Sequence, residues 1–275
     1  MKLYIATDLE GVTGVTGGWS EISPGCREHD HAKKMLTSDI NACAQGAFEG
    51  GADEIVVWDG HGASLSVNIE DVNPDIRLVK GRAIGHLPLI DESFDAMIIL
   101  GMHAMEGVSD GVMNGTWVGG GQRFWLNGKE VGELGLWMAM ASQLGIPTIM
   151  ATGDAALSRE ALDLVPDIYT AIVKIGISRY CCEIIPPKKA WANIACTARE
   201  AVRNYKKVSM YKPSTPVEMK VQYPTDTQLV DWIAQRPGVK KIDGSTLSYT
   251  GGSIKDAVGA LIYIAWWNLG DKPSI

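Results

Sequence analysis

The order of apolar and polar residues predicts alternating strands and helices over the first two-thirds of the chain. Short, uninterrupted apolar runs between polar or glycine-containing stretches are typical of strands buried on both faces of a parallel sheet. The runs of this kind are Leu3–Thr7, Glu54–Trp58, Ile76–Val79 and Ala96–Leu100. Between the first two, apolar residues recur at helical spacing over 37–47, and Gly50-Gly51 ends the predicted helix.

The pattern changes at Arg123–Val131, where two short strand-like runs flank Asn127-Gly128. This dipeptide favours a hairpin because both residues tolerate the positive φ of a type I′ turn. A helix over 133–144, a strand over 148–151 and a helix from Ser158 to Leu164 are expected next. Together these elements predict an α/β fold, with a mostly parallel, Rossmann-like sheet flanked by helices.

The adjacent residues Pro186 and Pro187 mark a change in composition, and we expect a domain boundary there. Residues 1–185 then form a larger α/β domain and residues 186–275 a smaller α+β domain. The elements expected in the smaller domain are helices over 189–205, from Thr225 or Thr227 to about Gln235, and over 253–269, with strands over 217–221, 240–242 and 246–249. The last helix can pack within the smaller domain or on the larger one.

Acidic residues and histidines stand where three of the predicted strands end. Asp8 and Glu10 follow the first strand. His61 and His103 follow the second and the fourth, and Glu133 begins the helix after the hairpin. Ligands of open α/β sheets bind outside the carboxyl ends of the strands. We therefore expect these side chains to face one region.

Carboxylates mixed with imidazoles suit a borderline divalent ion, above all zinc. Asp8 and Glu10 are two residues apart, so in extended backbone both side chains point to the same side and could hold or bridge two cations. Two neighbouring metal ions activate water and polarise a carbonyl, which is the chemistry of metal-assisted hydrolysis. Each residue alone also has a structural interpretation, the acids at turns or helix starts and the histidines as ordinary side chains. Their convergence favours a metal site.

Composition and charge exclude other classes. The 275 residues include 25 Lys and Arg against 32 Asp and Glu, a net charge of −7, without a basic block. Such a chain is a poor partner for nucleic acid or an anionic membrane. No apolar run reaches the roughly 18 residues of a membrane span, and the first residues do not resemble a signal peptide. The five cysteines include an adjacent pair and no CxxC, which predicts reduced thiols and a cytoplasmic location.

Thr7-Asp8-Leu9-Glu10-Gly11 resembles the SxDxEG motif of the DppA-type zinc D-aminopeptidases. The resemblance covers nearly the whole chain. It includes Met1–Gly11, Asp59–His61, Leu100–Ala104, Gly111–Met113, Val131–Leu136, Gly153-Asp154, Val173-Lys174 and Ile177–Arg179. It implies a zinc-dependent hydrolase that cleaves small peptides with an N-terminal D-residue, and a ring-like homo-oligomer, expected to be a decamer.

The resemblance also implies roles for particular residues. The metal ligands that it implies are Asp8, Glu10, His61, His103 and Glu133. Two zinc ions per chain are then expected, with one carboxylate bridging them. Asp59 precedes His61 by two residues and is expected either to orient it or to be an ordinary residue of a strand-end turn.

The chain departs from the family at one position. The family usually has a catalytic histidine in a stretch resembling Gly-Val-Met-Ser-His-Ser, and residues 111–116 here are Gly-Val-Met-Asn-Gly-Thr, which puts Gly115 at the histidine position. A glycine cannot supply the roughly 10²–10⁴-fold that a positioned acid or base contributes. Three interpretations stay open. In the first, Asn114 or His86 takes the role of the missing histidine. In the second, the substrate is a different amide or a cyclic amide. In the third, the protein is a non-catalytic binder of small molecules that keeps the metals.

Overall fold

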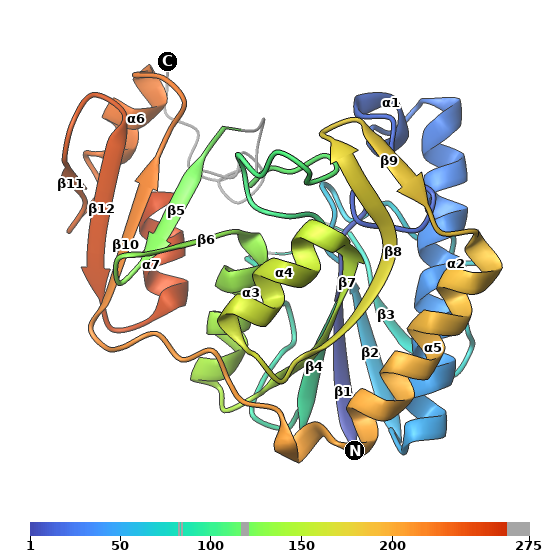
Figure 1. The fold of residues 1–275 in the computed structure, drawn as a ribbon. Helices are drawn as coiled ribbons and strands as arrows, with labels where there is room; N and C mark the ends of the chain where they lie inside the picture. Colours follow the sequence, from blue (N-terminus) through green and yellow to red (C-terminus); the bar gives the residue numbers. More distant parts are fainter. Residues whose placement is uncertain (82, 84, 117–120, 263–275) are drawn as a thin grey trace.

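The computed structural model describes residues 1–81, 83, 85–116 and 121–262. Its strands form one mostly parallel sheet and one antiparallel sheet, which lie side by side (Figure 1). The strands of the larger sheet run in the order β3-β2-β1-β4-β7-β8-β9. They are β1 (Lys2–Thr7), β2 (Glu54–Asp59), β3 (Arg77–Val79), β4 (Ala96–Met102), β7 (Thr148–Asp154), β8 (Tyr169–Ser178) and β9 (Cys181–Ile184).

Strand β1 lies between β2 and β4 in this sheet and pairs in parallel with both. At its carboxyl end, Thr7 lies opposite Asp59 of β2 and Leu100 of β4. The strands β4 and β7 are buried along their whole length, because helices cover both faces of the sheet. In this sheet β9 runs antiparallel to its neighbour β8. The expected α/β fold with a mostly parallel sheet is confirmed.

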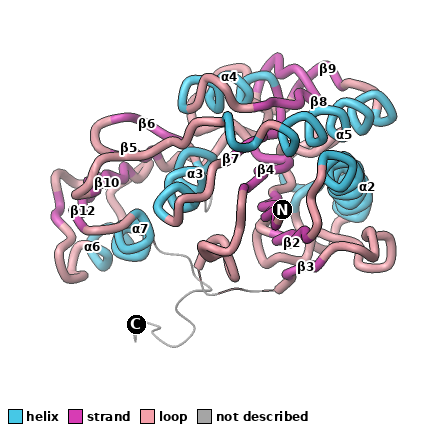
Figure 2. The backbone as a smooth tube through the Cα atoms, turned by 90° about the horizontal axis from the view of Figure 1, so that it is seen from below, coloured by secondary structure: helices cyan, strands magenta, loops and turns pink. Residues whose placement is uncertain are grey.

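Helices cover the two faces as two pairs, with α2 (Arg27–Gly50) and α5 (Pro187–Arg203) on one face. Figure 2 shows α3 (Glu133–Gln143) and α4 (Ala155–Leu164) on the other face. The first pair crosses at very short range, because a Cβ built on Gly46 would lie 2.0 Å from the carbonyl oxygen of Ala195. A short helix, α1 (Trp19–Ile22), lies beside α2.

The antiparallel sheet has the strand order β11-β12-β10-β5-β6. Its strands are β5 (Arg123–Leu126), β6 (Lys129–Val131), β10 (Val217–Gln222), β11 (Lys240–Lys241) and β12 (Thr246–Gly251), and its helices are α6 (Gln228–Ile233) and α7 (Ile254–Leu261). Leu136 and Ala139 of α3 are buried in the core of this sheet, whereas Leu134 and Trp137 of the same helix belong to the core of the larger one. Helix α3 therefore joins the two sheets.

The chain does not divide between the two sheets at residue 185. The hairpin of β5 and β6, which precedes that residue, pairs with β10 of the antiparallel sheet. Helix α5, which follows it, packs on the larger sheet through Ala190, Ile194 and Ala198. The composition change at Pro186-Pro187 marks the start of α5, because a proline in the first turn suits a helix N-terminus.

Several element boundaries differ from the expected ones. Helix α2 begins at Arg27, ten residues before position 37, and His29 is buried on its apolar face. The Asp154 side chain, not that of Ser158, caps α4 by accepting from the Leu157 amide at 2.8 Å. Strands β8 and β9 were not expected. The predicted end of the last helix, over 263–269, lies outside the described residues. Among those described, no helix is long and apolar enough to cross a membrane.

Candidate metal centre

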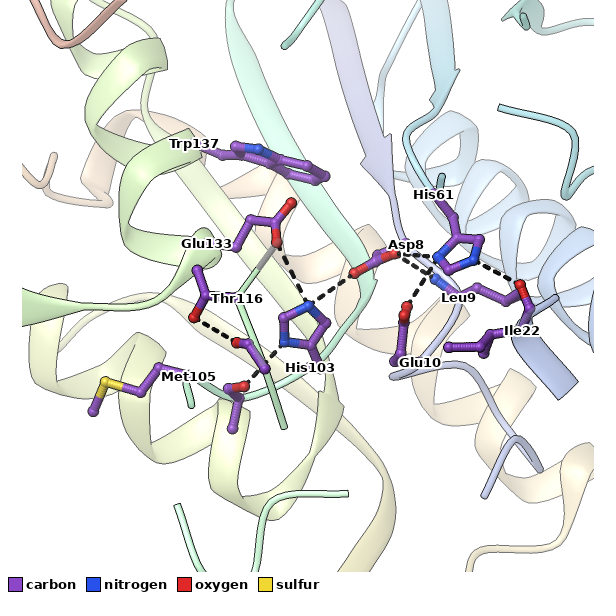
Figure 3. Close-up of polar contacts among 12 residues, drawn as sticks. Asp8, Leu9, Glu10, Ile22, His61, His103, Met105, Thr116, Glu133 and Trp137 are labelled. Atoms are coloured by element: carbon purple, nitrogen blue, oxygen red, sulfur yellow. Dashed lines mark hydrogen bonds and ion pairs between the residues drawn. The ribbon is translucent and has the colours of Figure 1, made fainter. Parts of the chain in front are cut away.

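The side chains predicted at the strand ends come together at the carboxyl edge of the larger sheet (Figure 3). Asp8 and Glu10 follow β1, and His61 follows β2. One donor atom from each of these three residues lies within 4.8 Å of the other two. His103 follows β4, and Glu133 is the first residue of α3. None of these five side chains is more than 14% exposed to solvent.

His61 faces both carboxylates that follow β1. Its Nδ1 lies 3.1 Å from Asp8 Oδ1 and 3.1 Å from Glu10 Oε2. Its other nitrogen, Nε2, lies 3.0 Å from the carbonyl oxygen of Ile22. A carbonyl oxygen only accepts hydrogen bonds, so Nε2 carries the proton. In the neutral ring the lone pair of Nδ1 then points at two carboxylates.

His103 has the corresponding arrangement on the other side of Asp8. Its Nε2 lies 3.4 Å from Asp8 Oδ2 and 3.6 Å from Glu133 Oε2. Its Nδ1 lies 3.0 Å from the carbonyl oxygen of Ala104, so the proton of the neutral ring is on Nδ1. Asp8 thus faces both imidazoles, one with each carboxylate oxygen.

These contacts fit a divalent cation. A lone pair that faces a carboxylate at 3.1–3.6 Å is unfavourable unless a proton or a metal ion lies between them. Each ring is held through its far nitrogen by a backbone carbonyl, which is how proteins orient metal-binding histidines. Carboxylates and imidazoles form the donor set that zinc accepts.

The ionisation of the cluster shows how strongly its charges interact. Burial alone lowers the pKa of His103, but Glu133, Asp8 and Glu10 outweigh it and raise that pKa to about 10. Burial likewise lowers the pKa of His61, but the carboxylates of Glu10 and Asp8 outweigh it and raise that pKa well above its ordinary value. Burial and the neighbouring Glu10 raise the pKa of Asp8 to about 7. The buried carboxylates therefore draw positive charge into this site.

Lys174 of β8 holds the loop that carries Glu10. Its fully buried ammonium group donates to the carbonyl oxygens of Glu10, Val12 and Val15 at 2.5, 3.1 and 2.5 Å. Burial lowers the pKa of Lys174 to about 8. The sequence resemblance included Lys174 without a role, because a contact to backbone oxygens leaves no spacing signal along the chain.

Gly11 lets the same loop approach β4. Its amide donates to the carbonyl oxygen of Gly101 at 2.7 Å. A Cβ at this position would lie 2.0 Å from the carbonyl oxygen of Met102, so only glycine fits. The close approach of the two backbones brings the loop with Glu10 beside the strand that leads into His103.

Asp59 is buried at the end of β2, where one oxygen, Oδ2, accepts from the amides of Ser66 and Val67 at 2.7 and 3.2 Å. Lys80 Nζ lies 3.5 Å from the same oxygen. These contacts hold the loop that follows His61, whereas the ring itself is held by the carbonyl of Ile22.

Gly115 lies next to His103. Its amide donates at 3.1 Å to the carbonyl of Ala104, the same group that holds the His103 ring. The side-chain amide of Asn114 donates through Nδ2 to the backbone carbonyls of Val108 and Gly111 at 2.9 and 2.8 Å. Those bonds use both hydrogens of the amide, so the contacts of Asn114 do not favour its expected role as a donor to substrate.

His86, which the sequence left without a location, lies on the Glu133 side of the centre. The indole N–H of Trp137 donates to His86 Nδ1 at 3.2 Å, and Trp58 packs against the same imidazole. An indole only donates, so the ring is neutral with its proton on Nε2. Burial lowers the pKa of His86 to about 4. A sequence pattern could not have placed it, because it belongs to an irregular segment.

Carboxylates and histidines that gather at the carboxyl edge of a mostly parallel α/β sheet are typical of the active site of a metal-dependent hydrolase. The comparisons are more specific. The model of a peptidase family described as D-aminopeptidase matches residues 1–262 of this chain. This chain therefore belongs to the D-aminopeptidase family, as its motifs predicted.

Two comparisons identify a similar protein. A D-aminopeptidase of Bacillus subtilis (strain 168) is 29% identical over 248 residues, which cover 90% of this chain and 89% of the relative. A solved structure, described as the Zn-dependent D-aminopeptidase DppA from Bacillus subtilis, a self-compartmentalizing protease, superposes with a TM-score of 0.91. It is 27% identical, and the alignment covers 100% of both chains. The similarity thus includes both sheets.

Proposed function

We propose that this protein is a dinuclear zinc-dependent hydrolase that cleaves small peptides or amides, with D-aminopeptidase activity as the first expectation. The observation that carries the proposal is the position of Asp8 between two imidazoles, with Glu10 beside His61 and Glu133 beside His103. Family membership and the zinc dependence of the similar Bacillus protein support it.

Each residue has a proposed part in this function. Asp8, Glu10 and His61 would hold one ion, and His103 and Glu133 would hold the other together with Asp8. When bound, zinc lowers the pKa of water and polarises the scissile carbonyl. The carbonyls of Ile22 and Ala104 keep the two imidazoles turned so that Nδ1 of His61 and Nε2 of His103 face the centre. The burial of the five side chains strengthens their attraction for a cation.

A second function is favoured by Gly115, which has no side chain to take part in proton transfer. The protein would then be a related amidohydrolase with a different substrate, such as a cyclic amide, or a metal-containing binder of small molecules. The engaged amide of Asn114 removes one substitute for the missing histidine. His86 is the other candidate, and its neutral ring near Glu133 suits a hydrogen-bond donor rather than a base.

One experiment separates these functions. The purified protein is analysed for bound metal and then tested with D-aminoacyl amides, D-peptides, L-peptides and cyclic amides. We expect about two zinc-type ions per chain and hydrolysis of D-substrates that Glu10→Ala and His103→Ala abolish. Less than one ion per chain, with no activity restored by zinc, cobalt or manganese, would contradict the proposal. Two bound ions with no turnover of any substrate would favour the binder.

We also propose that the chain forms a ring-like homo-oligomer, expected to be a decamer, in the cytoplasm. The description of the similar Bacillus protein as self-compartmentalizing supports assembly. Ile175 and Ile177 of β8 are 45% and 67% exposed on one side of that strand and suit a subunit contact. The five free cysteines suit a reducing compartment. Light scattering of the full chain tests the assembly, and a monomer at micromolar concentration would contradict it.

A further inference from the structure

Helix α4 holds the segment that leads from His103 to Gly115, through side chains that take no part in the metal centre. The Asp154 cap accepts from the Val112 amide with Oδ2 at 2.6 Å. The Arg159 guanidinium contacts both oxygens of Asp110 at 2.7 and 2.6 Å. Glu160 makes the third contact, at the His103 end of the segment.

The carboxylate of Glu160 binds two different segments of backbone at once. Its Oε2 accepts from the amide of Met105 at 2.8 Å, and its Oε1 accepts from the amide of Gly132 at 3.1 Å. Met105 follows His103 by two residues, and Gly132 immediately precedes Glu133. One side chain from a third element therefore joins the backbones that carry two of the proposed ligands.

Gly132 shows how closely this carboxylate approaches the backbone. A Cβ at that position would lie 2.5 Å from Glu160 Oε1 and 2.7 Å from Met105 Cβ. Any larger residue would displace Glu160 or the His103 loop. The three residues form one packed unit in which the carboxylate is the polar link between the two segments.

The contact of Glu160 with both backbones matters because His103 and Glu133 follow elements that belong to different sheets. His103 leaves β4 of the larger sheet, whereas Glu133 follows the hairpin of β5 and β6, which belongs to the antiparallel sheet. A shift of the second sheet relative to the first would separate His103 Nε2 from Glu133 Oε2, now 3.6 Å apart. A carboxyl group with both oxygens bound to backbone amides resists such a shift because it is planar and holds its two oxygens, and the amides bound to them, at a fixed separation.

We propose that Glu160 is the positioning residue that sets the separation of His103 and Glu133 and thereby the affinity of that half of the centre for its metal ion. The inference rests on the proposed dinuclear site. Residues that orient ligands in this way typically change metal affinity by about 10–100-fold when they are replaced. Glu160 itself is not expected to contact the metal or the substrate.

The test is metal titration of the full chain. Apoprotein is titrated with Co²⁺, followed by visible absorption, and with Zn²⁺, followed by calorimetry, for the wild type and Glu160→Ala. We expect one of the two ions to bind about 10–100-fold more weakly in the variant, while the ion held by Asp8, Glu10 and His61 binds as in the wild type. Glu160→Gln keeps the shape and one acceptor oxygen, and we expect an intermediate loss.

Arg159→Ala is the matched control, because it removes the neighbouring contact of α4 with the same segment and touches neither Met105 nor Gly132. We expect both ions to bind to it within twofold of the wild type. Circular dichroism checks that every variant is folded. Two unchanged affinities in Glu160→Ala, or an equal weakening of both ions, would overturn the inference and leave the proposed function intact. A wild type that binds fewer than two ions would instead contradict the proposed dinuclear site.

Discussion

Asp8 Oδ2 lies 3.4 Å from His103 Nε2. The other oxygen of the same carboxylate faces His61, so Asp8 would contact both ions of the proposed dinuclear centre. We therefore expect Asp8→Asn to lose both ions, because an amide does not neutralise a cation, and Glu133→Gln to lose one. Elemental analysis of the purified variants measures this. Retention of both ions by Asp8→Asn would contradict the shared position of the carboxylate.

Gly115→His restores an imidazole beside His103. Among the residues that the structure describes, a Cβ at residue 115 would meet only the carbonyl oxygen of Met113, at 3.8 Å, so these neighbours leave room for a side chain. If the rest of the site is that of a D-aminopeptidase, we expect turnover of D-aminoacyl amides to rise about 100-fold or more. Gly115→Ala is the control for the backbone change and should not gain activity. An equal rate in both variants would indicate a pocket adapted to a different substrate.

Gly11→Ala tests the close approach of the two backbones. The new methyl group would lie 2.0 Å from the carbonyl oxygen of Met102, which forces the loop with Glu10 away from β4. We expect the free energy of unfolding in guanidinium chloride to fall by at least about 2 kcal/mol, with weaker zinc binding. Gly115→Ala, whose Cβ would be in ordinary van der Waals contact with the carbonyl oxygen of Met113 at 3.8 Å, should change that free energy by less than about 0.5 kcal/mol. Equal stabilities of the two variants would argue against the contact.

Metal removal should destabilise the native state. Without a cation, the buried carboxylates of Asp8, Glu10 and Glu133 face the imidazoles of His61 and His103 with no metal ion between them, and folding loses the binding free energy. Zinc at 100 times its dissociation constant is expected to add about 2.7 kcal/mol to the free energy of unfolding. Thermal unfolding with a chelator and with added zinc measures it. A melting temperature that does not depend on zinc would count against a native site.

Asp39 provides a pH-dependent contribution to stability. Its oxygens accept from the amide of Thr13 at 3.0 Å and the indole of Trp191 at 2.9 Å, and burial raises its pKa to about 6. Because the pKa of Asp39 is higher in the folded chain than in the unfolded chain, the protonated carboxyl stabilises the folded state. This stabilisation is complete below about pH 4 and is lost as the pH rises through about 6. The stability of the wild type relative to Asp39→Asn should fall by about 3 kcal/mol over that window.

Urea unfolding of both proteins at several pH values, with a chelator present, measures this difference. Comparing the two proteins cancels the titration of every other group. A constant difference between pH 4 and pH 7 would show that the Asp39 carboxyl ionises alike in the folded and unfolded chains.

The sequence was sufficient for the residues that gather at the strand ends. Asp8, His61 and His103 follow compact apolar runs, and parallel strands place their carboxyl ends at one edge whatever the details of packing. The hairpin at Asn127-Gly128 is a local property of the backbone, which is why it was readable. Asp8 and Glu10 instead follow the end of β1 in a bend and turn, so the loop and not the alternation of an extended strand brings both carboxylates to His61. The motif resemblance identified the family for a related reason, because the acids and histidines next to strand ends lie in short sequence motifs.

Other parts of the fold depend on contacts between distant segments. Helix α2 extends back to Arg27, and His29, a polar residue by type, is buried there against other parts of the molecule. Nothing in the sequence of the hairpin of β5 and β6 indicated that it would pair with β10, which lies on the other side of the expected domain boundary. Strand pairing across such distances depends on which apolar faces remain to be covered.

What the sequence alone determined is the set of chemical groups and their family: three acids, two histidines and a glycine at position 115. Tertiary structure decided how those groups are held. Lys174 binds carbonyl oxygens and Glu160 binds amides. Every residue has a backbone carbonyl and every residue except proline has a backbone N–H, so no pattern of side chains along the chain could identify these contacts. The shared position of Asp8 between His61 and His103 is likewise a product of the sheet, because only the pairing of β1 with both β2 and β4 brings the two imidazoles to one carboxylate.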